Sequence, residues 1–377
     1  MNIFLHMQTP KQFIEKLLKE ADVLIDGPRP WDIQVHNEEL YARILRGGSL
    51  AFGESYMDGW WDAENLDETM TKIFNADLTK KMRLSPAAVR AYLHAVLTNQ
   101  SRAAKAFEVG EKHYDIGNDL FERMLDKRMA YTCGYWKNAQ SLDQAQEHKL
   151  DLICKKIDIK PGQRILDIGC GWGSFAKYAA EHYGASVVGI TISKEQVALA
   201  RERCVGHDVE IRLQDYRDVD EQFDHIISIG MFEHVGYKNY RTYLEIVHRC
   251  LKDNGLFLLH TIGGNTSVTH TDPWIDKYIF ANSMLPSIKQ ISNAAEKLFV
   301  IEDWHNFGTD YDKTLMAWYD NFISHWDEIN DTYSERFFRM WEFYLLTCAG
   351  SFRSRKNQLW QIVMSKNGVL GGYTSIR

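Results

Sequence analysis

The chain has 377 residues and a formal net charge of −7, and 45% of its residues are hydrophobic and 25% charged. This composition is typical of a soluble globular protein with room for two or three domains. The negative charge excludes a general electrostatic attraction to nucleic acid, so a nucleic-acid enzyme is not expected.

The sequence carries no sign of a membrane span or a secretory signal. No stretch approaches the roughly 18 consecutive apolar residues that a spanning helix needs. The start, Met-Asn-Ile-Phe-Leu-His, lacks the basic region and apolar core of a signal peptide. Scattered cysteines without a CxxC pair predict reduced thiols in a cytoplasmic protein and no metal site. These cysteines are Cys133, Cys154, Cys170, Cys204, Cys250 and Cys348.

Residues 1–97 are expected to form a smaller N-terminal α+β domain. Thr9-Pro10 is typical of a helix start, and the apolar residues that follow share one helical face. That helix either packs on its own domain or lies on a membrane. Short strands are expected at 23–25 and 31–35, and residues 47–62 are expected to be rich in turns.

A basic stretch from Lys80 to Lys105 contains six Lys and Arg residues and no acidic residue. It is either a solvated face that acidic groups balance elsewhere, or a contact with anionic lipid head groups. The polar residues near its end predict a linker at 98–108. The second domain is then expected to span 109–377.

A glycine-rich stretch, Arg164–Gly173, reads Arg-Ile-Leu-Asp-Ile-Gly-Cys-Gly-Trp-Gly. Its apolar half is typical of a buried strand, and a helical pattern follows it. Glycines between a strand and a helix let the backbone approach a ligand, because no Cβ intervenes. Asp167, followed by Gly169, Gly171 and Gly173, resembles the first motif of class I methyltransferases, which bind S-adenosylmethionine. The alternative is a tight turn without a ligand.

Strands and helices then alternate, as in a doubly wound sheet. Strands are expected at Arg164–Ile168, Ser186–Thr191, Val209–Leu213, Phe223–Ile229, Leu256–Thr261 and Phe299–Glu302, and helices at Asp143–Lys156, Phe175–His182, Lys194–Arg203 and Tyr240–Leu251. A terminal strand at Leu359–Met364 would close the edge of the sheet. We therefore predict an α/β fold with a doubly wound, seven-stranded, mostly parallel sheet of the Rossmann-like, class I methyltransferase kind.

The ends of the second and third strands refine the prediction of a cofactor site. Many methyltransferases carry an acid for the ribose at the end of the second strand, and this chain has none there. Ser193 and Gln196 form a capping box for the next helix. The predicted cofactor-binding residues are Tyr131, Thr132, Asp167, Gly169, Gly171, Gly173, Thr191, Ser193, Gln196, Gln214, Asp215 and Tyr216.

Seven blocks of sequence, in this order, resemble the cyclopropane fatty acid synthases. They are Tyr131–Trp136, Asp167–Gly173, Val188–Ser193, Met231–Gly236, Leu259–Gly263, Glu302–Gly308 and Asp310–Asp312. The resemblance extends over the whole chain. It includes the N-terminal extension that separates the phospholipid-acting bacterial enzymes from their single-domain mycolic acid relatives.

The resemblance implies an enzyme that adds a methylene group from S-adenosylmethionine across the cis double bond of a phospholipid acyl chain. It also implies a bound bicarbonate as the base, held by Cys133, Glu233, His260, Tyr311 and the Ile262 backbone. A homodimer with peripheral contact to the inner face of the membrane is expected on the same ground.

Each of these assignments has an alternative in the sequence alone. From the sequence alone, Cys133 is also consistent with an inert buried thiol, Glu233 with a helix-start residue and His260 with a core histidine. The alternative functions are a methyltransferase that makes a methyl-branched or N/O-methylated product, and a catalytically idle lipid-binding homologue. Five basic residues are interpreted as solvated rather than as head-group ligands: Arg336, Arg339, Arg353, Arg355 and Lys356.

Overall fold

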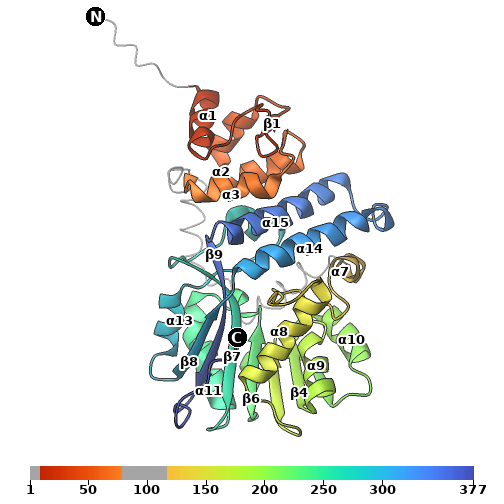
Figure 1. Ribbon diagram of the computed structural model, residues 1–377, viewed down its shortest axis with the longest axis vertical. Coiled ribbons are helices and arrows are strands. Elements are labelled where there is room, and N and C mark those ends of the chain that lie inside the picture. The colour runs from red at the N-terminus through yellow and green to blue at the C-terminus, as the bar shows by residue number, and fades with distance from the viewer. Residues whose placement is uncertain (1–8, 79–116) are drawn as a thin grey trace, which may run out of the picture.

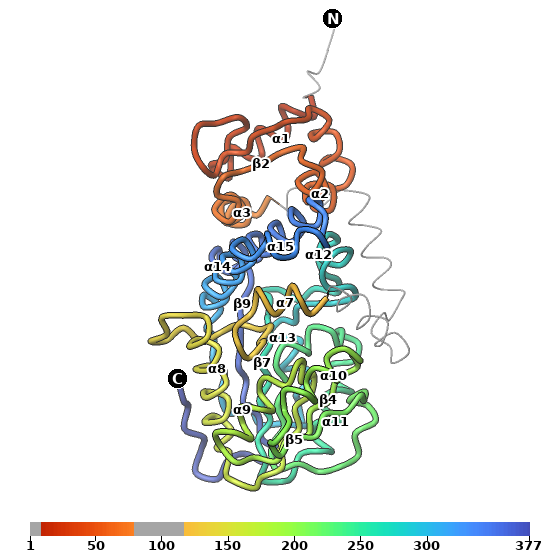
Figure 2. The backbone as a smooth tube through the Cα atoms, turned by 90° about the vertical axis from the view of Figure 1, so that its right-hand side faces the viewer, coloured from red at the N-terminus to blue at the C-terminus, as the bar shows by residue number. Residues whose placement is uncertain are grey.

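The computed structural model describes residues 9–78 and 117–377, so the basic stretch and the predicted linker lie outside the described residues. A helical N-terminal unit lies above two long helices, and these cross the top of a sheet that has helices on both faces (Figures 1 and 2). Within the two described ranges, no helix is long and apolar enough to cross a membrane.

The central sheet confirms the predicted fold class. Its strands are β3 (Arg164–Ile168), β4 (Ser186–Thr191), β5 (Val209–Leu213), β6 (His225–Ile229), β7 (Leu256–Gly264), β8 (Val300–Asn306) and β9 (Asn357–Ser365). They lie in the order β5-β4-β3-β6-β7-β9-β8, and β3 to β7 are parallel.

The terminal strand does not close the edge, contrary to the prediction. β9 lies between β7 and β8 and is antiparallel to both, so β8 runs in the direction of β7 and forms the edge. Gln358 to Ser365 are all buried, as suits an interior strand, whereas Val300 and Ile301 at the start of β8 are exposed.

Alternate residues of the strands face two separate helical layers. Ile165 and Ile227 belong to the core under α8 (Leu142–Lys156), α9 (Ser174–Tyr183) and α10 (Lys194–Arg203). The opposite face packs on α11 (Tyr240–Cys250) and α13 (Ile288–Ala295). The remaining elements of this part are α7 (Asn118–Met124), α12 (Pro273–Tyr278), α14 (Thr309–Ser324), α15 (Glu335–Arg353) and the 3-10 turns η1 (Tyr216–Asp218), η2 (Phe232–His234), η3 (Tyr237–Asn239) and η4 (Trp326–Glu328).

The N-terminal unit is mainly helical within residues 9–78. It contains α1 (Pro10–Glu20), β1 (Gln34–Val35), α2 (Leu40–Met57), β2 (Trp61–Asp62) and α3 (Leu66–Asn75). The predicted first helix is confirmed, with a capping box between Thr9 and Gln12, and its buried face packs on its own unit. Ile25 and Ile33 form an isolated bridge in place of longer strands.

The turns expected at residues 47–57 are reduced to a single break, because α2 runs through the other residues. Only Gly48 leaves helical geometry, with φ 58° and ψ −137°, and it kinks the helix. Glycine disfavours helix by about 1 kcal/mol per residue, a preference that tertiary contacts override. Gly53 is needed there, since a Cβ would lie 2.5 Å from the Trp274 ring of α12.

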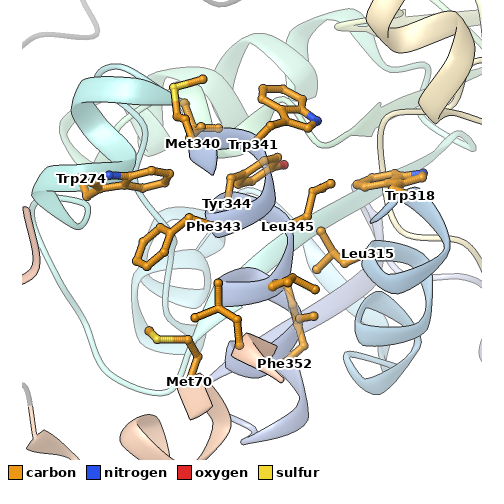
Figure 3. Packing of buried hydrophobic residues seen from close by; sticks show 14 of the residues in the cluster. Met70, Trp274, Leu315, Trp318, Met340, Trp341, Phe343, Tyr344, Leu345 and Phe352 are labelled. Carbon is orange, nitrogen blue, oxygen red and sulfur yellow. The ribbon is translucent and has the colours of Figure 1, made fainter. Parts of the chain in front are cut away.

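Helix α15 joins the N-terminal unit to the rest of the molecule. Figure 3 shows side chains of α15 packed against Met70 of α3, Trp274 of α12, and Leu315 and Trp318 of α14. These residues belong to one continuous apolar core. Burying aromatic side chains of this size contributes roughly 1.5–3 kcal/mol each, so the two parts are stabilised together.

Three of the five basic residues interpreted as solvated form ion pairs instead. Arg336, Arg339 and Arg353 pair with acidic residues of the N-terminal unit. Their partners there are Asp58, Asp62 and Asp67. The three arginines therefore help to fasten α15 to that unit.

We expect Gly350→Ala to lower the free energy of unfolding by about 1–3 kcal/mol. A Cβ at Gly350 would lie 2.8 Å from the carbonyl oxygen of Asp67 and 3.0 Å from the amide nitrogen of Thr71, both on α3. These are backbone atoms, so the clash outweighs the better helix propensity of alanine. Urea unfolding measures the change, with the exposed Glu335→Ala on the same helix as control, expected within about 0.5 kcal/mol. Equal stability of Gly350→Ala and the parent protein would contradict the close backbone contact between α15 and α3.

Candidate active site

One large cavity of about 1210 Å³ opens at the carboxyl ends of the parallel strands. Strands β4 and β5 lie on one side of β3, and β6 and β7 lie on its other side. The direction in which successive strands are added therefore reverses between β3 and β6. Open α/β sheets bind ligands at such a switch point. The cavity wall there includes Asp167 at the end of β3, Gly169 just after β3 and Gly230 after β6.

The glycine-rich turn supplies an open backbone cradle. Gly169, Gly171 and Gly173 have φ values of 82°, 55° and 79°, which L-residues rarely adopt. A Cβ at Gly171 would project into open space, whereas a Cβ at Gly169 would lie 2.7 Å from Cβ of Met231. Gly171 therefore leaves room for a ligand against the backbone, and this fits the cradle that S-adenosylmethionine needs. Gly173 lies behind the wall and begins α9.

The ends of β4 and β5 bring most of the other predicted cofactor residues to the same wall. Thr191 donates its hydroxyl to Oε1 of Gln196 at 2.8 Å, and Ser193 caps α10 from behind the wall. The Gln196 side chain thus bonds to Thr191, and the predicted capping box is only half formed. Asp215 is paired with Arg217 at 2.8 Å. Gln214, Asp215 and Tyr216 all line the cavity.

Tyr131 and Thr132 reach the cavity from the segment before α8. The Tyr131 hydroxyl donates to the hydroxyl of Tyr344 on α15 at 2.9 Å. Thr132 Oγ1 accepts from the Lys149 ammonium at 2.8 Å. These two residues therefore connect the sheet edge with the long helices above it.

Glu233 has one satisfied and one unsatisfied carboxyl oxygen. Oε1 accepts from the Ile262 backbone N–H at 2.7 Å, while Oε2 is buried and has no partner among the described residues. Burial raises the pKa of Glu233 to about 7. The Ile262 backbone was predicted as an anion ligand, and its N–H donates to Glu233 instead.

His260 and Cys133 lie just behind the described cavity wall. The side-chain amide of Gln361 lies 3.3 Å from Nδ1 of His260, and Nε2 of His260 is buried without a partner among the described residues. Burial, together with the charges of Lys149 and Lys156, holds the pKa of His260 well below its usual range. Burial likewise raises the pKa of the Cys133 thiol well above its usual value. Both groups are neutral at physiological pH.

Tyr311 lies on the wall itself, on α14, with its ring packed against Phe352 at 4.6 Å. Burial raises the pKa of this phenol well above its usual range. The site therefore combines a phenol, a thiol, an imidazole and a carboxyl group whose ionisation is suppressed.

The far half of the cavity is apolar and extends into the N-terminal unit. Its wall includes Ile14, Leu17, Leu18, Ile44, Ile73, Phe74, Phe343 and Phe352. Phe343 of α15 lines this half of the cavity, whereas Trp318 and Trp341 are fully buried in the core. Arg355 and Lys356 lie at the wall of the same cavity.

The cavity wall also holds a residue that sequence reasoning missed. Lys149 on α8 is 1% exposed, and Asp167 at the end of β3 is 2% exposed. Burial lowers the pKa of Lys149 to about 8 and raises that of Asp167 to about 8, while each charge favours the other. The signal in the sequence was the position of Lys149 on the apolar stripe of the predicted helix.

A family match and a sequence match with known proteins agree with each other. Residues 101–362 match the mycolic acid cyclopropane synthetase family. The chain is 54% identical over 357 residues to the cyclopropane-fatty-acyl-phospholipid synthase of Escherichia coli K12, which covers 95% of this chain and 93% of that protein. The chain belongs to the mycolic acid cyclopropane synthetase family.

Other family relatives include proteins with different stated products. The chain is 31% identical to the tuberculostearic acid methyltransferase UfaA1 of Mycobacterium tuberculosis, over 90% of this chain and 84% of that protein. The solved mycolic acid cyclopropane synthase CmaA1, in complex with SAH and CTAB, is 30% identical with a TM-score of 0.65. That similarity covers 69% of this chain and 98% of CmaA1, so the family fold matches the part built around the sheet.

The raised pKa of Glu233 predicts a pH dependence of stability. Between its ordinary pKa of 4.5 and about 7, the unfolded chain loses a proton that the folded chain keeps, so stability falls as pH rises. The slope approaches about 1.4 kcal/mol per pH unit, and Glu233→Gln removes it. In urea unfolding we expect the variant to gain stability relative to the parent over this range. Glu195→Gln, which changes an exposed residue, is the matched control. If the difference in free energy of unfolding between Glu233→Gln and the parent did not change with pH, the raised pKa of Glu233 would be contradicted.

Proposed function

We propose that this enzyme transfers a methylene group from S-adenosylmethionine to the cis double bond of an unsaturated acyl chain in a phospholipid, giving a cyclopropane ring. The supporting observation is the single cavity that connects the glycine cradle after β3 with the apolar passage into the N-terminal unit. A methyl donor and a lipid tail therefore have one chamber in which to meet.

The reaction requires alignment of the methyl donor with the alkene and exclusion of water from the site. An alkene is a weak nucleophile, so the sulfonium methyl has to be held in line with it at close range. The new C–C bond forms as the S–CH₃ bond breaks, which releases S-adenosylhomocysteine and leaves a carbocation. Loss of a proton from the new methyl group then lets the ring close. Apolar walls such as Phe352 exclude water that would capture the cation, and the Tyr311 ring stabilises positive charge by about 0.5–2 kcal/mol.

The proton-accepting site is proposed to be formed by Cys133, Glu233, His260 and Tyr311. The phenol of Tyr311 and the protonated form of Glu233 are donors, and so is Nε2 of His260 in the tautomer that carries its proton there. Neutral donors attract an anion without repelling it. The orphaned Glu233 Oε2 and His260 Nε2 support a small buried ligand between them. A bicarbonate bound there would supply the base. The Ile262 amide contributes by orienting Glu233.

Product analysis tests the proposed activity. Purified protein is incubated with isotope-labelled S-adenosylmethionine and vesicles of unsaturated phospholipid, and the fatty acids are analysed by mass spectrometry. A cyclopropane and a reduced methyl-branched chain differ by two hydrogens. The ring product supports the proposal, the methyl-branched product supports the methyltransferase alternative, and no product with intact binding supports the idle homologue.

We expect Glu233→Ala and His260→Ala to lower turnover by about 100-fold or more, because both serve proton removal. The affinity for S-adenosylhomocysteine, measured by calorimetry, should change by less than about threefold, since neither group belongs to the glycine cradle. Thr191→Val is the contrasting control and should weaken cofactor binding. A large loss of cofactor affinity in either alanine variant would contradict its role.

We also propose that the enzyme meets its substrate as a peripheral protein on the inner face of the membrane, as a homodimer, with the 80–105 basic stretch against anionic head groups. Each basic residue near such a surface contributes about 1 kcal/mol. Reversing the charges of Lys80, Lys81 and Arg83 should reduce co-sedimentation with anionic vesicles, and more strongly at low salt. Unchanged sedimentation would contradict this contact, and analytical ultracentrifugation tests the dimer.

A further inference from the structure

Lys149 is a fully buried lysine that the proposed methyl transfer does not use. It lies on α8, and its ammonium donates to Thr132 Oγ1 at 2.8 Å at the wall of the cavity. Placing an ammonium group in a protein interior costs several kcal/mol unless it is paired and hydrogen-bonded. Among the described residues its charged neighbours are Asp126 and Asp167.

Asp126 already has a structural task. Its two carboxylate oxygens accept from the backbone N–H groups of Arg128 at 2.9 Å and Ala130 at 2.8 Å. These bonds shape the loop that leads to Thr132. Asp126 remains the stronger charge partner of Lys149, and Asp167, at the end of β3, is the partner that lies on the cavity wall.

Thr132 is held from three directions. Gln146, one turn before Lys149 on α8, donates to the Thr132 carbonyl at 2.7 Å. On the other side, a Cβ at Gly230 would lie 2.6 Å from Cγ2 of Thr132, so the threonine methyl packs on the backbone at the end of β6. With the carbonyl and the methyl fixed, the hydroxyl is the group that Lys149 orients.

An ammonium group can only donate hydrogen bonds, so Thr132 Oγ1 accepts from Lys149 and its own proton has to point elsewhere. We propose that Lys149 is a positioning residue for the amino-acid end of S-adenosylmethionine. It turns the Thr132 hydroxyl into a donor for the ligand carboxylate, and its charge favours the carboxylate form of Asp167 as a partner for the ligand ammonium.

The ionisation of the two buried groups agrees with this geometry. Burial alone raises the pKa of Asp167 and lowers that of Lys149, and the attraction between them opposes both changes. Without the lysine, Asp167 would be protonated more of the time and would lose its attraction for an ammonium group.

Calorimetric binding of S-adenosylhomocysteine, which carries the same amino-acid end, tests the proposal without lipid or turnover. Lys149→Met should weaken binding by at least about tenfold, because a charged hydrogen bond and a charge pair are both lost. Lys149→Met leaves the buried Asp126 and Asp167 without their counter-charge, so the thermal midpoint should stay the same or fall. A lysine with a merely structural role would lower the midpoint but leave the affinity of the folded protein unchanged.

Two further variants separate the hydrogen bond from the charge. Lys149→Gln keeps a donor for Thr132 and should bind with intermediate affinity. Thr132→Val removes the acceptor, and its effect should not add to that of Lys149→Met in the double variant. The control Lys155→Met changes an exposed lysine on the same helix and should bind like the parent.

At saturating S-adenosylmethionine, the kcat of Lys149→Met should approach that of the parent protein. The defect should therefore appear as a raised KM for S-adenosylmethionine. Parental affinity in any folded protein among Lys149→Met, Lys149→Gln and Thr132→Val would overturn the proposal, as would additive effects in the double variant. Because the ligand is bound without lipid, this outcome is independent of which product the enzyme makes.

Discussion

The chamber at the carboxyl edge of the sheet depends on the packing of α15. This helix lies between the N-terminal helices and the sheet, and its Phe343 and Phe352 are part of the chamber wall. Burial beside this chamber keeps His260 and Tyr311 neutral and raises the pKa of Glu233 to about 7. Residues of the N-terminal unit, among them Ile14 and Ile73, complete the chamber wall. The N-terminal unit is therefore a part of the site and more than an attachment to it.

The two ends of the chamber differ in charge. The end under the glycine cradle holds the buried pair of Lys149 and Asp167, which suits a ligand with an ammonium and a carboxylate. The reaction end holds neutral hydrogen-bond donors, which suit a small anion. Between them the walls are apolar. This order lets one chamber bind a charged co-substrate and still shield a cation from water.

The parallel strands and the glycine turn were predictable because their signals are local. A short apolar run and the following glycines suffice to define β3, and the prediction of Arg164–Ile168 agrees with the structure. The place of β9 was not predictable, because an apolar run such as Leu359–Met364 is compatible with an edge as well as an interior position. Its neighbours come from distant parts of the chain. The same holds for α2, where contacts with α12 and α15 override the glycines.

The candidate site was predictable where its residues follow strands, since the ends of parallel strands meet at one edge. Gln214 and Glu233 reach the cavity for that reason. Lys149 follows no strand and belongs to no motif, and lysines are almost always exposed. The only sign of its burial in the sequence is its position along the helix, because α8 also buries Ala145, Gln146 and Ile153 on the same side. A charged residue in such a stripe requires a partner in the interior, and for Lys149 a strand end supplies one, Asp167 of β3. The second buried lysine of α8, Lys156, meets Asp303 and His305 away from the cavity, so a buried lysine on this helix indicates an interior partner, and only the glycine motif indicates the ligand site.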